Sequence, residues 1–548
     1  MYGSNQLAPG TPRGLSSRAI TAGHRRDVRG IMDRDPVAGS ALTDVPWIRT
    51  SDGPMTVQDA LLGAHNIAGF DPGLNGIESG AQIRFLAAVA ALVVRRQGGP
   101  ARAFAADAVL NVVDELEPAC NLFDADRPFL QAAHDGKGLV SGQRNPVKRL
   151  YPWMPADRAE GFWSRGAVAK EFPMADATLA LVVHYHYSFG GNNSIDGRSC
   201  VNGSPGIRYP GLGYTATELL WHGASLFETL TMNLPKTWVD GTGLPAWADP
   251  SCAVSRGGAG KPEHPLWRAT WGSNTAQCLW ADGALVAVSI GGSRDLPPTM
   301  RAGKDGAKEW WDLRNTEDPF YLYVEVQTKN APGVVTAVQL KAQRLDFGHQ
   351  ETDLVVEWNA KGLSTAVRER SQGAMKTPGR SASLMFLRHL VEGTATCPVV
   401  RRTEVLISSP KKWVIADERT RAVAQAAGLV KAVCAEVAKP FTLKGRLTAL
   451  RDRRADAETA FWRNVTAPFE EFIINGTGTT IDPAVWPRVR AAALDAFDEI
   501  AASAPGPKLA PFIMTARSSV ARNVTGLMGR LVKDDTAWTA IEEMEVPA

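Results

Sequence analysis

The C-terminal part of the chain carries helical periodicity and little else, and this constrains the fold more than any other feature of the sequence. After about residue 413, apolar residues recur every three or four positions along four separate stretches. They are Val423, Ala427, Val430, Cys434 and Val437; Phe461, Val465, Phe469 and Phe472; Trp486, Val489, Ala493, Phe497 and Ile500; and Val520, Val524, Leu527 and Leu531. Each set forms one apolar stripe on a helix. We therefore predict a four-helix bundle over residues 413–548, with Pro468 bending its second helix.

The preceding residues mix two kinds of signal. Apolar periodicity predicts helices over Val57 to Gly63, Glu78 to Gln97 and Phe104 to Leu116. Runs of β-branched and apolar residues predict strands at 284–290, 320–326, 334–340 and 353–358. The predicted class is therefore α+β: a large irregular mixed α/β domain with long functional loops over 41–412, followed by the bundle. Residues 1–40, rich in Gly, Ser and Arg, are predicted to form a flexible basic arm.

Composition narrows the class of protein. A chain of 548 residues, 44% of them apolar, favours more than one domain. The net charge of +3 is small for this length, so any contact with nucleic acid has to come from local patches. Six scattered cysteines without a C-x-x-C pair are typical of reduced thiols. The apolar run at 85–94 is too short to span a bilayer and no signal peptide is recognised, so we expect a cytoplasmic protein.

One basic patch lies in the connection between the first two predicted bundle helices. Residues 439–454 read KPFTLKGRLTALRDRR and contain a single acidic residue, Asp452. The candidate phosphate contacts in this patch are Lys444, Arg446, Arg451, Arg453 and Arg454. A patch of this kind is more often a solvated surface, and contact with a nucleic-acid backbone is the alternative.

The stretch HYHYSFGGNNSIDG, residues 184–197, first suggests a metal site. On a strand, His184 and His186 would point to the same side and could share a metal ion. Such a site needs a third or fourth ligand, and no cysteine or acidic cluster stands nearby. A strand edge is the more common interpretation, so no metal is predicted. A metal-dependent hydrolase that uses both histidines and a remote carboxylate stays as an alternative.

Gly190 and Gly191 in the same stretch do not form a phosphate loop. No Lys-Ser or Lys-Thr pair follows them to open a helix. Two glycines permit positive φ angles and close approach to a flat partner such as a DNA groove, or simply a tight turn. The common nucleotide-binding, zinc-protease, nucleophile-elbow and kinase motifs are also missing, so we predict no cofactor.

Several features follow one another along the chain in a recognisable order. They are Pro46-Trp47-Ile48, Arg127-Pro128-Phe129-Leu130-Gln131, Ser188-Phe189-Gly190-Gly191, the segment TLTMNLP from Thr229 to Pro235, and the terminal bundle. In this order they resemble the CasA family, the large subunit of the type I-E CRISPR surveillance complex Cascade. The resemblance extends over most of the chain.

The resemblance implies a subunit that is not an enzyme. Members of the family examine double-stranded DNA for a short protospacer-adjacent motif from the minor groove, start strand separation and R-loop formation, and recruit a helicase-nuclease for antiviral defence. The implied partners are the other Cascade subunits, guide RNA, target DNA and the helicase-nuclease, with no membrane. One copy per complex and a monomer in isolation are also implied. This division of work is physically reasonable because guide pairing reads the target while protein reads only the short motif.

The resemblance also implies roles for particular residues. The glycine loop that enters the minor groove corresponds to Ser188, Phe189, Gly190 and Gly191. The strand-separating wedge hairpin corresponds to His349 and Gln350. The basic residue that enters the minor groove corresponds first to Lys304, placed between glycines at an expected hairpin tip, and otherwise to Arg301 or Lys308.

A further loop of the family anchors the subunit near the guide RNA. It corresponds here to Phe162, Trp163 and Ser164, and the asparagine that relatives carry at the third position is absent. A scaffold subunit that binds only other proteins stays as the second alternative to the DNA-sensing function.

Overall fold

The computed structural model describes residues 39–533 of the chain with internal gaps. The gaps are residues 100, 134–145, 155–169, 190–193, 196–197, 200–203, 209–211, 259–260, 293–295, 330–334, 349, 380, 395–396, 477–484 and 504–505.

The first helices form where the apolar periodicity predicted them. They are α1 (Val57–Leu62), α2 (Gly76–Arg96) and α3 (Ala106–Leu116). The side chain of Asn75 accepts hydrogen bonds from the backbone N–H groups of Ile77 and Glu78, and Glu78 accepts one from Asn75, which closes a capping box at the start of α2. The later helices before the bundle are α4 (Met174–Tyr187), α5 (Leu226–Asn233), α6 (Lys236–Val239), α7 (Pro265–Thr270), α8 (Lys304–Glu317), α9 (Glu351–Ala360), α10 (Leu363–Gln372) and α11 (Pro410–Trp413).

Helix α2 lies at the centre of the core. By length and composition it could cross a membrane, yet 89% of its most apolar window is buried inside the protein. The helix predicted over Glu78 to Gln97 is therefore confirmed, and it is a helix of the core.

Two larger sheets contain strands from distant parts of the sequence. One has the order β3-β9-β4-β5 with β8 also paired to β9, and the other has the order β13-β12-β6 with β7 also paired to β12. The bounds of the first sheet are β3 Phe172–Pro173, β4 Ser194–Ile195, β5 Arg198–Ser199, β8 Asn274–Ala281 and β9 Ala284–Gly292. Those of the second are β6 Gly213–Tyr214, β7 Glu218–His222, β12 Ser383–Thr394 and β13 Cys397–Ser408.

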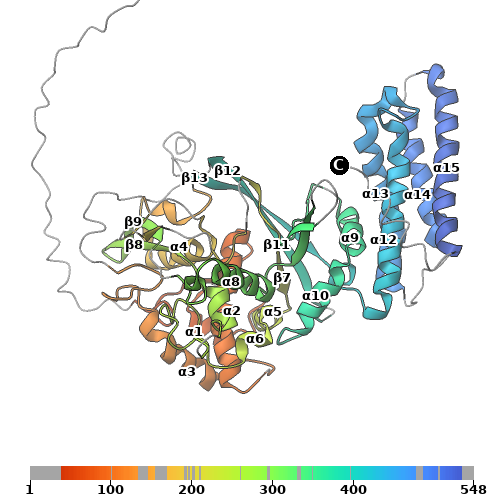
Figure 1. Cartoon of the computed structure of the whole chain (residues 1–548). Coiled ribbons are helices and arrows are strands. Elements are labelled where there is room, and N and C mark those ends of the chain that lie inside the picture. The colour runs from red at the N-terminus through yellow and green to blue at the C-terminus, as the bar shows by residue number, and fades with distance from the viewer. Residues whose placement is uncertain are drawn as a thin grey trace, which may run out of the picture. The chain divides into compact units, whose positions relative to one another are not determined.

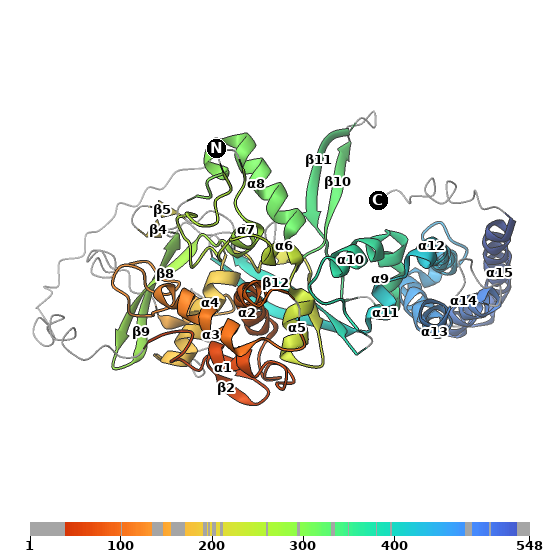
Figure 2. The same ribbon diagram turned by 90° about the horizontal axis from the view of Figure 1, so that it is seen from below.

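Two further strand pairs are independent hairpins. One consists of β1 (Ile48–Thr50) and β2 (Gly53–Met55). The other consists of β10 (Tyr323–Lys329) and β11 (Val335–Ala342), whose antiparallel register runs from Tyr323 opposite Ala342 to Lys329 opposite Val335. Figure 2 shows this second hairpin extending well beyond the elements at its base. The strands predicted at 284–290 and 334–340 are therefore confirmed, and the one predicted at 320–326 begins only at Tyr323.

Strand β12 separates two apolar clusters because its side chains alternate between its faces. Met385 and Leu387 point into the cluster that surrounds α2 and α4. Leu384 and Phe386 point into a second cluster, which continues through α9 and α10 into the C-terminal helices.

The predicted α+β class with a C-terminal four-helix bundle is confirmed. Helices α12 (Asp417–Ala438), α13 (Arg454–Asn475), α14 (Val485–Ala502) and α15 (Ala510–Lys533) lie alongside one another (Figure 1). The predicted stripes of α12, α13 and α14 are buried throughout, as are Val520 and Val524 of α15. Pro468 lies inside α13. The boundary between residues 412 and 413 stays a prediction.

The strand predicted at 353–358 is wrong, because these residues belong to helix α9. Acidic residues in its first turn favour a helix N-terminus. Leu354, Val355, Val356 and Trp358 are all buried, while Asp353 and Glu357, four residues apart, lie on the less buried side of the helix. The short run of β-branched residues beside an aromatic one favoured a strand in the sequence.

Candidate nucleic-acid interface

His184 and His186 lie on helix α4, which corrects the predicted strand. Two positions along a helix differ by about 200°, so the two rings point in different directions. The Nε2 atom of His184 lies 3.3 Å from the carbonyl oxygen of Thr275, and Nδ1 of His186 lies 2.9 Å from that of Val182. Both rings are buried in the core.

This environment keeps both imidazoles uncharged at neutral pH. Burial lowers the pKa of His184 to about 4 and that of His186 to about 3. Among the residues that the structure describes, no group of three His, Cys, Asp or Glu side chains could hold a metal ion. The histidines pack as core residues, and the expected glycine loop begins directly after the helix that carries them.

The first residues of the expected glycine loop are held by buried side chains. The carbonyl oxygen of Ser188 accepts a hydrogen bond from Nδ2 of Asn274 at 3.1 Å and another from the hydroxyl of Ser204. Asn274 also donates to the Ser204 hydroxyl at 2.7 Å. Phe189 is partly buried and packs against the main core, while Gly190 and Gly191 lie outside the described residues. Asn274 therefore joins the two ends of the 189–203 segment, which we call the loop root (Ser188 and Ser204).

Tyr187, the residue before the loop root, occupies a slot between two glycines. Its hydroxyl donates to Glu218 at 2.8 Å, and Glu218 is completely buried together with Arg84. A Cβ atom at Gly80 would lie 2.1 Å from the Tyr187 hydroxyl oxygen, and one at Gly206 would lie 2.6 Å from the ring. The backbone N–H of Gly206 donates to the carbonyl of His186 at 2.7 Å, which fixes the second wall of the slot.

Replacing Gly206 with alanine is expected to lower the free energy of unfolding by about 1–3 kcal/mol, because the added methyl group overpacks the buried Tyr187 ring. Urea unfolding measures this loss. Gly69→Ala is the matched control, because a Cβ at Gly69 meets nothing within 4 Å. Equal stability of the two variants would contradict the close fit of Tyr187.

The predicted minor-groove basic residues lie at the start of a helix rather than at a hairpin tip. Arg301 belongs to the short helix η5 (Met300–Ala302), and Lys304 is the first residue of α8. Gly303 has φ +93°, a value that glycine adopts readily, and a Cβ at Gly306 would meet the carbonyl oxygen of Thr299 at 2.3 Å. The two glycines thus form the turn into α8, which explains why they suggested a hairpin in the sequence.

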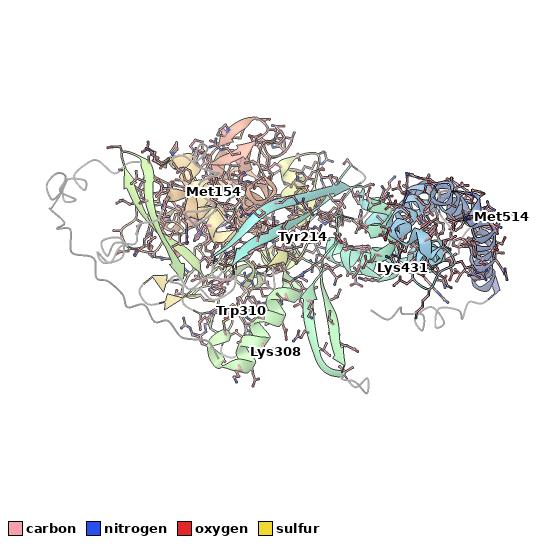
Figure 3. All side chains as sticks on the ribbon, turned by 90° about the horizontal axis from the view of Figure 1, so that it is seen from above. Met154, Tyr214, Lys308, Trp310, Lys431 and Met514 are labelled. Atoms are coloured by element: carbon pink, nitrogen blue, oxygen red, sulfur yellow. The ribbon has the colours of Figure 1, made fainter. Side chains whose placement is uncertain are left out.

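The turn before Lys304 is tied to the core. The buried carboxylate of Glu263 accepts hydrogen bonds from the backbone N–H of Thr299 at 2.7 Å and from its hydroxyl at 2.8 Å. Trp310 is buried on the inner side of α8, whereas Lys308 is exposed (Figure 3). The core therefore orients this end of the helix.

The charges on α8 distinguish the three basic candidates. Lys308 forms an ion pair with Asp312 at 2.5 Å, and Asp305 and Glu309 lie beside it on the helix surface. Arg301 donates through Nε to the carbonyl of Leu296 at 2.9 Å. Lys304 is exposed and has no ion pair with any described residue. Contact with a phosphate or a groove is therefore favoured at Lys304 over Lys308.

The wedge hairpin expected around His349 and Gln350 is a helix start instead. His349 lies outside the described residues, and Gln350 precedes the first turn of α9, where its Nε2 donates to the carbonyl of Thr459 at 3.2 Å. Two hairpins flank α9 and α10 in the sequence: β10 and β11 form one, whose β11 contacts α8, and β12 and β13 form a longer one that ends with Thr394 opposite Cys397. Val335 and Val338 on β11 are 43% and 48% exposed.

The remaining predicted sites are only partly described. Phe162, Trp163 and Ser164 lie outside the described residues. In the basic patch, Arg453 pairs with Asp456 and Arg454 pairs with Glu458 on α13, while Arg451 lies 3.7 Å from Asp452. Lys444 and Arg446 are exposed and have no ion pair with described residues, so they are the members of the patch available to an external anion.

The comparisons with known proteins agree with one another on one family. A family model described as CRISPR-associated protein Cse1 matches residues 41–504. Among solved structures, Cse1 from Acidimicrobium ferrooxidans matches with a TM-score of 0.60 and 18% identity, covering 91% of this chain and 100% of that one. CasA (Cse1) from Thermus thermophilus matches with a TM-score of 0.55 and 17% identity, covering 90% and 100%.

A chain in a structure described as a CRISPR RNA-guided surveillance complex also matches, with a TM-score of 0.59 and 16% identity over 88% of this chain and 99% of that one. At these identities the structural matches show a shared fold. No curated protein sequence matches the chain.

Proposed function

This chain belongs to the CRISPR-associated protein Cse1 family, and on that premise we propose that it is the non-catalytic large subunit of a type I-E RNA-guided surveillance complex. In this role it recognises a protospacer-adjacent motif in double-stranded DNA from the minor groove, helps to open the strands and recruits a helicase-nuclease. The family match over residues 41–504 carries the proposal. The subunit acts in the cytoplasm, needs no cofactor and is present in one copy per complex.

The geometry at the loop root supports motif reading by the Ser188 to Gly191 loop. Glycine at Gly190 and Gly191 lets backbone approach the floor of the narrow minor groove, where a side chain would collide with the groove walls. The Ser188 carbonyl at the start of the loop is already held in place by Asn274 and Ser204. Preorganisation of this kind lowers the entropy lost on binding.

The hairpin of β12 and β13 is a better candidate for strand separation than Gln350. The side chain of Gln350 is engaged with α13 through Thr459. The β12–β13 hairpin ends with Thr394 opposite Cys397, and β12 is also paired with β6 and β7 in its sheet. Inserting a protein segment between base pairs costs a few kcal/mol per unstacked step, so the segment needs firm support at its base.

The direct test is a guide-RNA complex reconstituted with and without this chain, at fixed salt. Its affinity is measured for duplexes that differ only in the base pairs beside the protospacer. Motif discrimination that requires this chain supports the proposal. Binding that ignores both the motif and this chain contradicts it and favours a scaffold that binds only proteins.

Gly190→Asp is expected to reduce motif-dependent affinity by about tenfold or more, because a carboxylate and its added bulk would face the phosphate-lined groove. Fluorescence anisotropy of the assembled complex on a motif-containing duplex measures the change. Gly526→Asp on α15 is the control, because it adds the same side chain where a Cβ meets nothing within 4 Å. Equal affinities of the two variants would remove the glycine loop from motif recognition.

A further inference from the structure

One buried arginine of helix α7, Arg268, contacts both the segment that supports the start of α8 and the end of α8. Helices α7 and α8 lie next to each other (Figure 2). The Nη1 atom of Arg268 donates to the backbone carbonyl oxygen of Glu263. Its Nε and Nη2 atoms donate to the carboxylate of Glu317, the last residue of α8, at 3.1 Å and 2.5 Å. Arg268 is 2% exposed, so its planar fork of donors is held inside the protein.

Glu263 contacts the turn that precedes α8. Its carboxylate accepts hydrogen bonds from both the N–H and the hydroxyl of Thr299, so one acid fixes two donors of the same residue. The carbonyl oxygen of Thr299 accepts a hydrogen bond from the N–H of Ala302 at 3.1 Å and leaves no room for a Cβ atom at Gly306. Thr299 therefore lies against the first turn of α8, and the place of Lys304 in that turn depends on it.

The backbone of Lys304 is held more firmly than its side chain. The side chain is exposed and forms no ion pair with any residue that the structure describes. The backbone belongs to a helix whose inner face is fixed by Trp310, which is fully buried and meets the Trp271 ring in a T-shaped contact at 5.1 Å. A lysine side chain loses rotamer entropy when it is ordered, so a fixed backbone leaves less entropy to be lost on binding.

We infer that Arg268, Glu263 and Thr299 are positioning residues for Lys304, which hold the first turn of α8 so that this lysine meets DNA at the motif. This inference rests on the proposed function, because it takes Lys304 as the basic residue that contacts motif DNA. Arg268 and Glu263 are buried, so they act on DNA only through the residues that they hold. Their effect on binding should disappear once the lysine charge is absent, which distinguishes positioning from general stability.

The test is a double-mutant cycle of Thr299→Val and Lys304→Ala, measured as the affinity of the reconstituted guide-RNA complex for a motif-containing duplex. Thr299→Val removes the hydroxyl donor, keeps the N–H and hardly changes the side-chain volume. It is expected to weaken binding by about fivefold, since only part of the lost hydrogen-bond energy reaches Lys304. Lys304→Ala is expected to weaken binding by about tenfold and to lower the slope of log affinity against log salt by about one.

In the double variant, Thr299→Val is expected to cause no loss beyond that of Lys304→Ala, because no charge is left to position. Thr299→Ser keeps both donors and is expected to bind within about twofold of the wild type. Single losses that multiply in the double variant would show that Thr299 acts independently of Lys304, and would overturn the inference.

Thr231→Val is the matched control for the loss of a threonine hydroxyl. Thr231 is 2% exposed, and its hydroxyl donates to the carbonyl of Phe227 at 2.8 Å within α5. Any loss of affinity in this variant is expected to multiply with that of Lys304→Ala. If the control also caused a loss that vanished in the Lys304→Ala background, general stability would explain the result and the inference would be overturned.

Hydrogen exchange of the free chain separates this inference from the proposed function. Arg268→Lys and Thr299→Val are each expected to raise amide exchange in residues 304–308 by about fivefold, without any DNA present. Unchanged exchange there would show that these contacts do not hold the start of α8, and would overturn the inference. A wild-type complex that binds duplexes regardless of the motif would contradict the proposed function, whereas the exchange result would still decide whether these residues hold α8.

Discussion

Replacing Glu218 with leucine is expected to lower the free energy of unfolding by about 3–5 kcal/mol, because it leaves the buried guanidinium of Arg84 without its counter-charge. Glu218 is completely buried and Arg84 is 4% exposed. The carboxylate accepts a hydrogen bond from Nε of Arg84 at 3.1 Å, a closer contact from Nη2, and one from the Tyr187 hydroxyl at 2.8 Å. The guanidinium carbon also lies 4.1 Å from the centroid of the Phe320 ring.

The charges of Arg84 and Glu218 depend on each other, and this predicts how the single and double variants differ in stability. Burial raises the pKa of Glu218, and the charge and hydrogen bonds of Arg84, with the hydrogen bond from Tyr187, oppose that rise. Once Glu218 is absent, the acidic group among the described residues that still acts on Arg84 is Asp318, whose carboxylate lies 3.5 Å from the guanidinium of Arg208 and forms no hydrogen bond with Arg84. The double variant Arg84→Met/Glu218→Leu removes both charges together, and it is expected to be more stable than Glu218→Leu alone.

Urea unfolding of the two single variants and the double variant completes a double-mutant cycle. Glu392→Leu is the control, because Glu392 and Arg401 form an exposed pair at 3.3 Å, which is expected to contribute about 1 kcal/mol or less. A double variant as unstable as the sum of its single variants would show that the two charges do not depend on each other.

The protein is expected to lose stability as the pH falls below about 6.5, before most carboxylates become protonated. Three buried histidines cause this. Burial lowers the pKa of His184 to about 4, and those of His186 and His389 to about 3. In the unfolded chain these rings regain their ordinary pKa, so acid protonates the unfolded state first and favours it.

Proton linkage gives the direction and the size of this loss of stability. Between pH 6.5 and the folded-state pKa values the unfolded chain binds more protons, so stability rises with pH across this window and is lost as the pH falls. At about pH 5 each histidine is expected to have cost roughly 2 kcal/mol, or roughly 6 kcal/mol for the three, an amount similar to the whole stability of many domains.

Urea unfolding at pH 7.5, 6 and 5 measures this slope. His389→Asn is expected to flatten it, because one titrating ring is removed. Thr403→Val is the matched control, since it removes the hydroxyl that lies 3.0 Å from Nδ1 of His389 and leaves the ring in place. It is expected to lower stability by a similar amount at each pH. An unchanged slope in His389→Asn would show that this ring does not contribute to acid unfolding.

Sequence patterns predicted elements well where one side of a segment faces solvent. The stripes of α12, α13 and α14 and the helices α1 and α3 were located correctly, because an amphipathic helix shows its period in the order of its residues. Helix α2 was also located correctly, although it is buried on nearly every side. The same reasoning failed for α4, where buried residues cover nearly the whole circumference and leave no polar side to mark the period. It also failed for α9, whose short run of β-branched and aromatic residues favoured a strand.

The residues of the candidate site were likewise predicted only in part from the sequence. The sequence drew attention to Ser188 and Phe189 through the glycines that follow, and to Lys304 through the glycines that flank it. It gave no signal for Asn274 or Arg268, because an isolated polar residue has no local pattern that distinguishes a buried contact from an exposed side chain. It also placed a hairpin at His349 and Gln350, where the structure has the start of α9 at Gln350, because local sequence does not show which strands pair.

By itself, then, the sequence determined the fold class, the helical C-terminal bundle and the family resemblance, since each depends on residue order and short-range periodicity. Only the tertiary structure decided that the histidines are core residues and that Arg84 and Glu218 form a buried pair. It also decided that Arg268 contacts both the support of the α8 start and the end of that helix. These contacts join residues that lie far apart in the chain, or surround a side chain with several segments at once. Local sequence contains no record of such contacts, because they form only when distant segments bury their surfaces against one another.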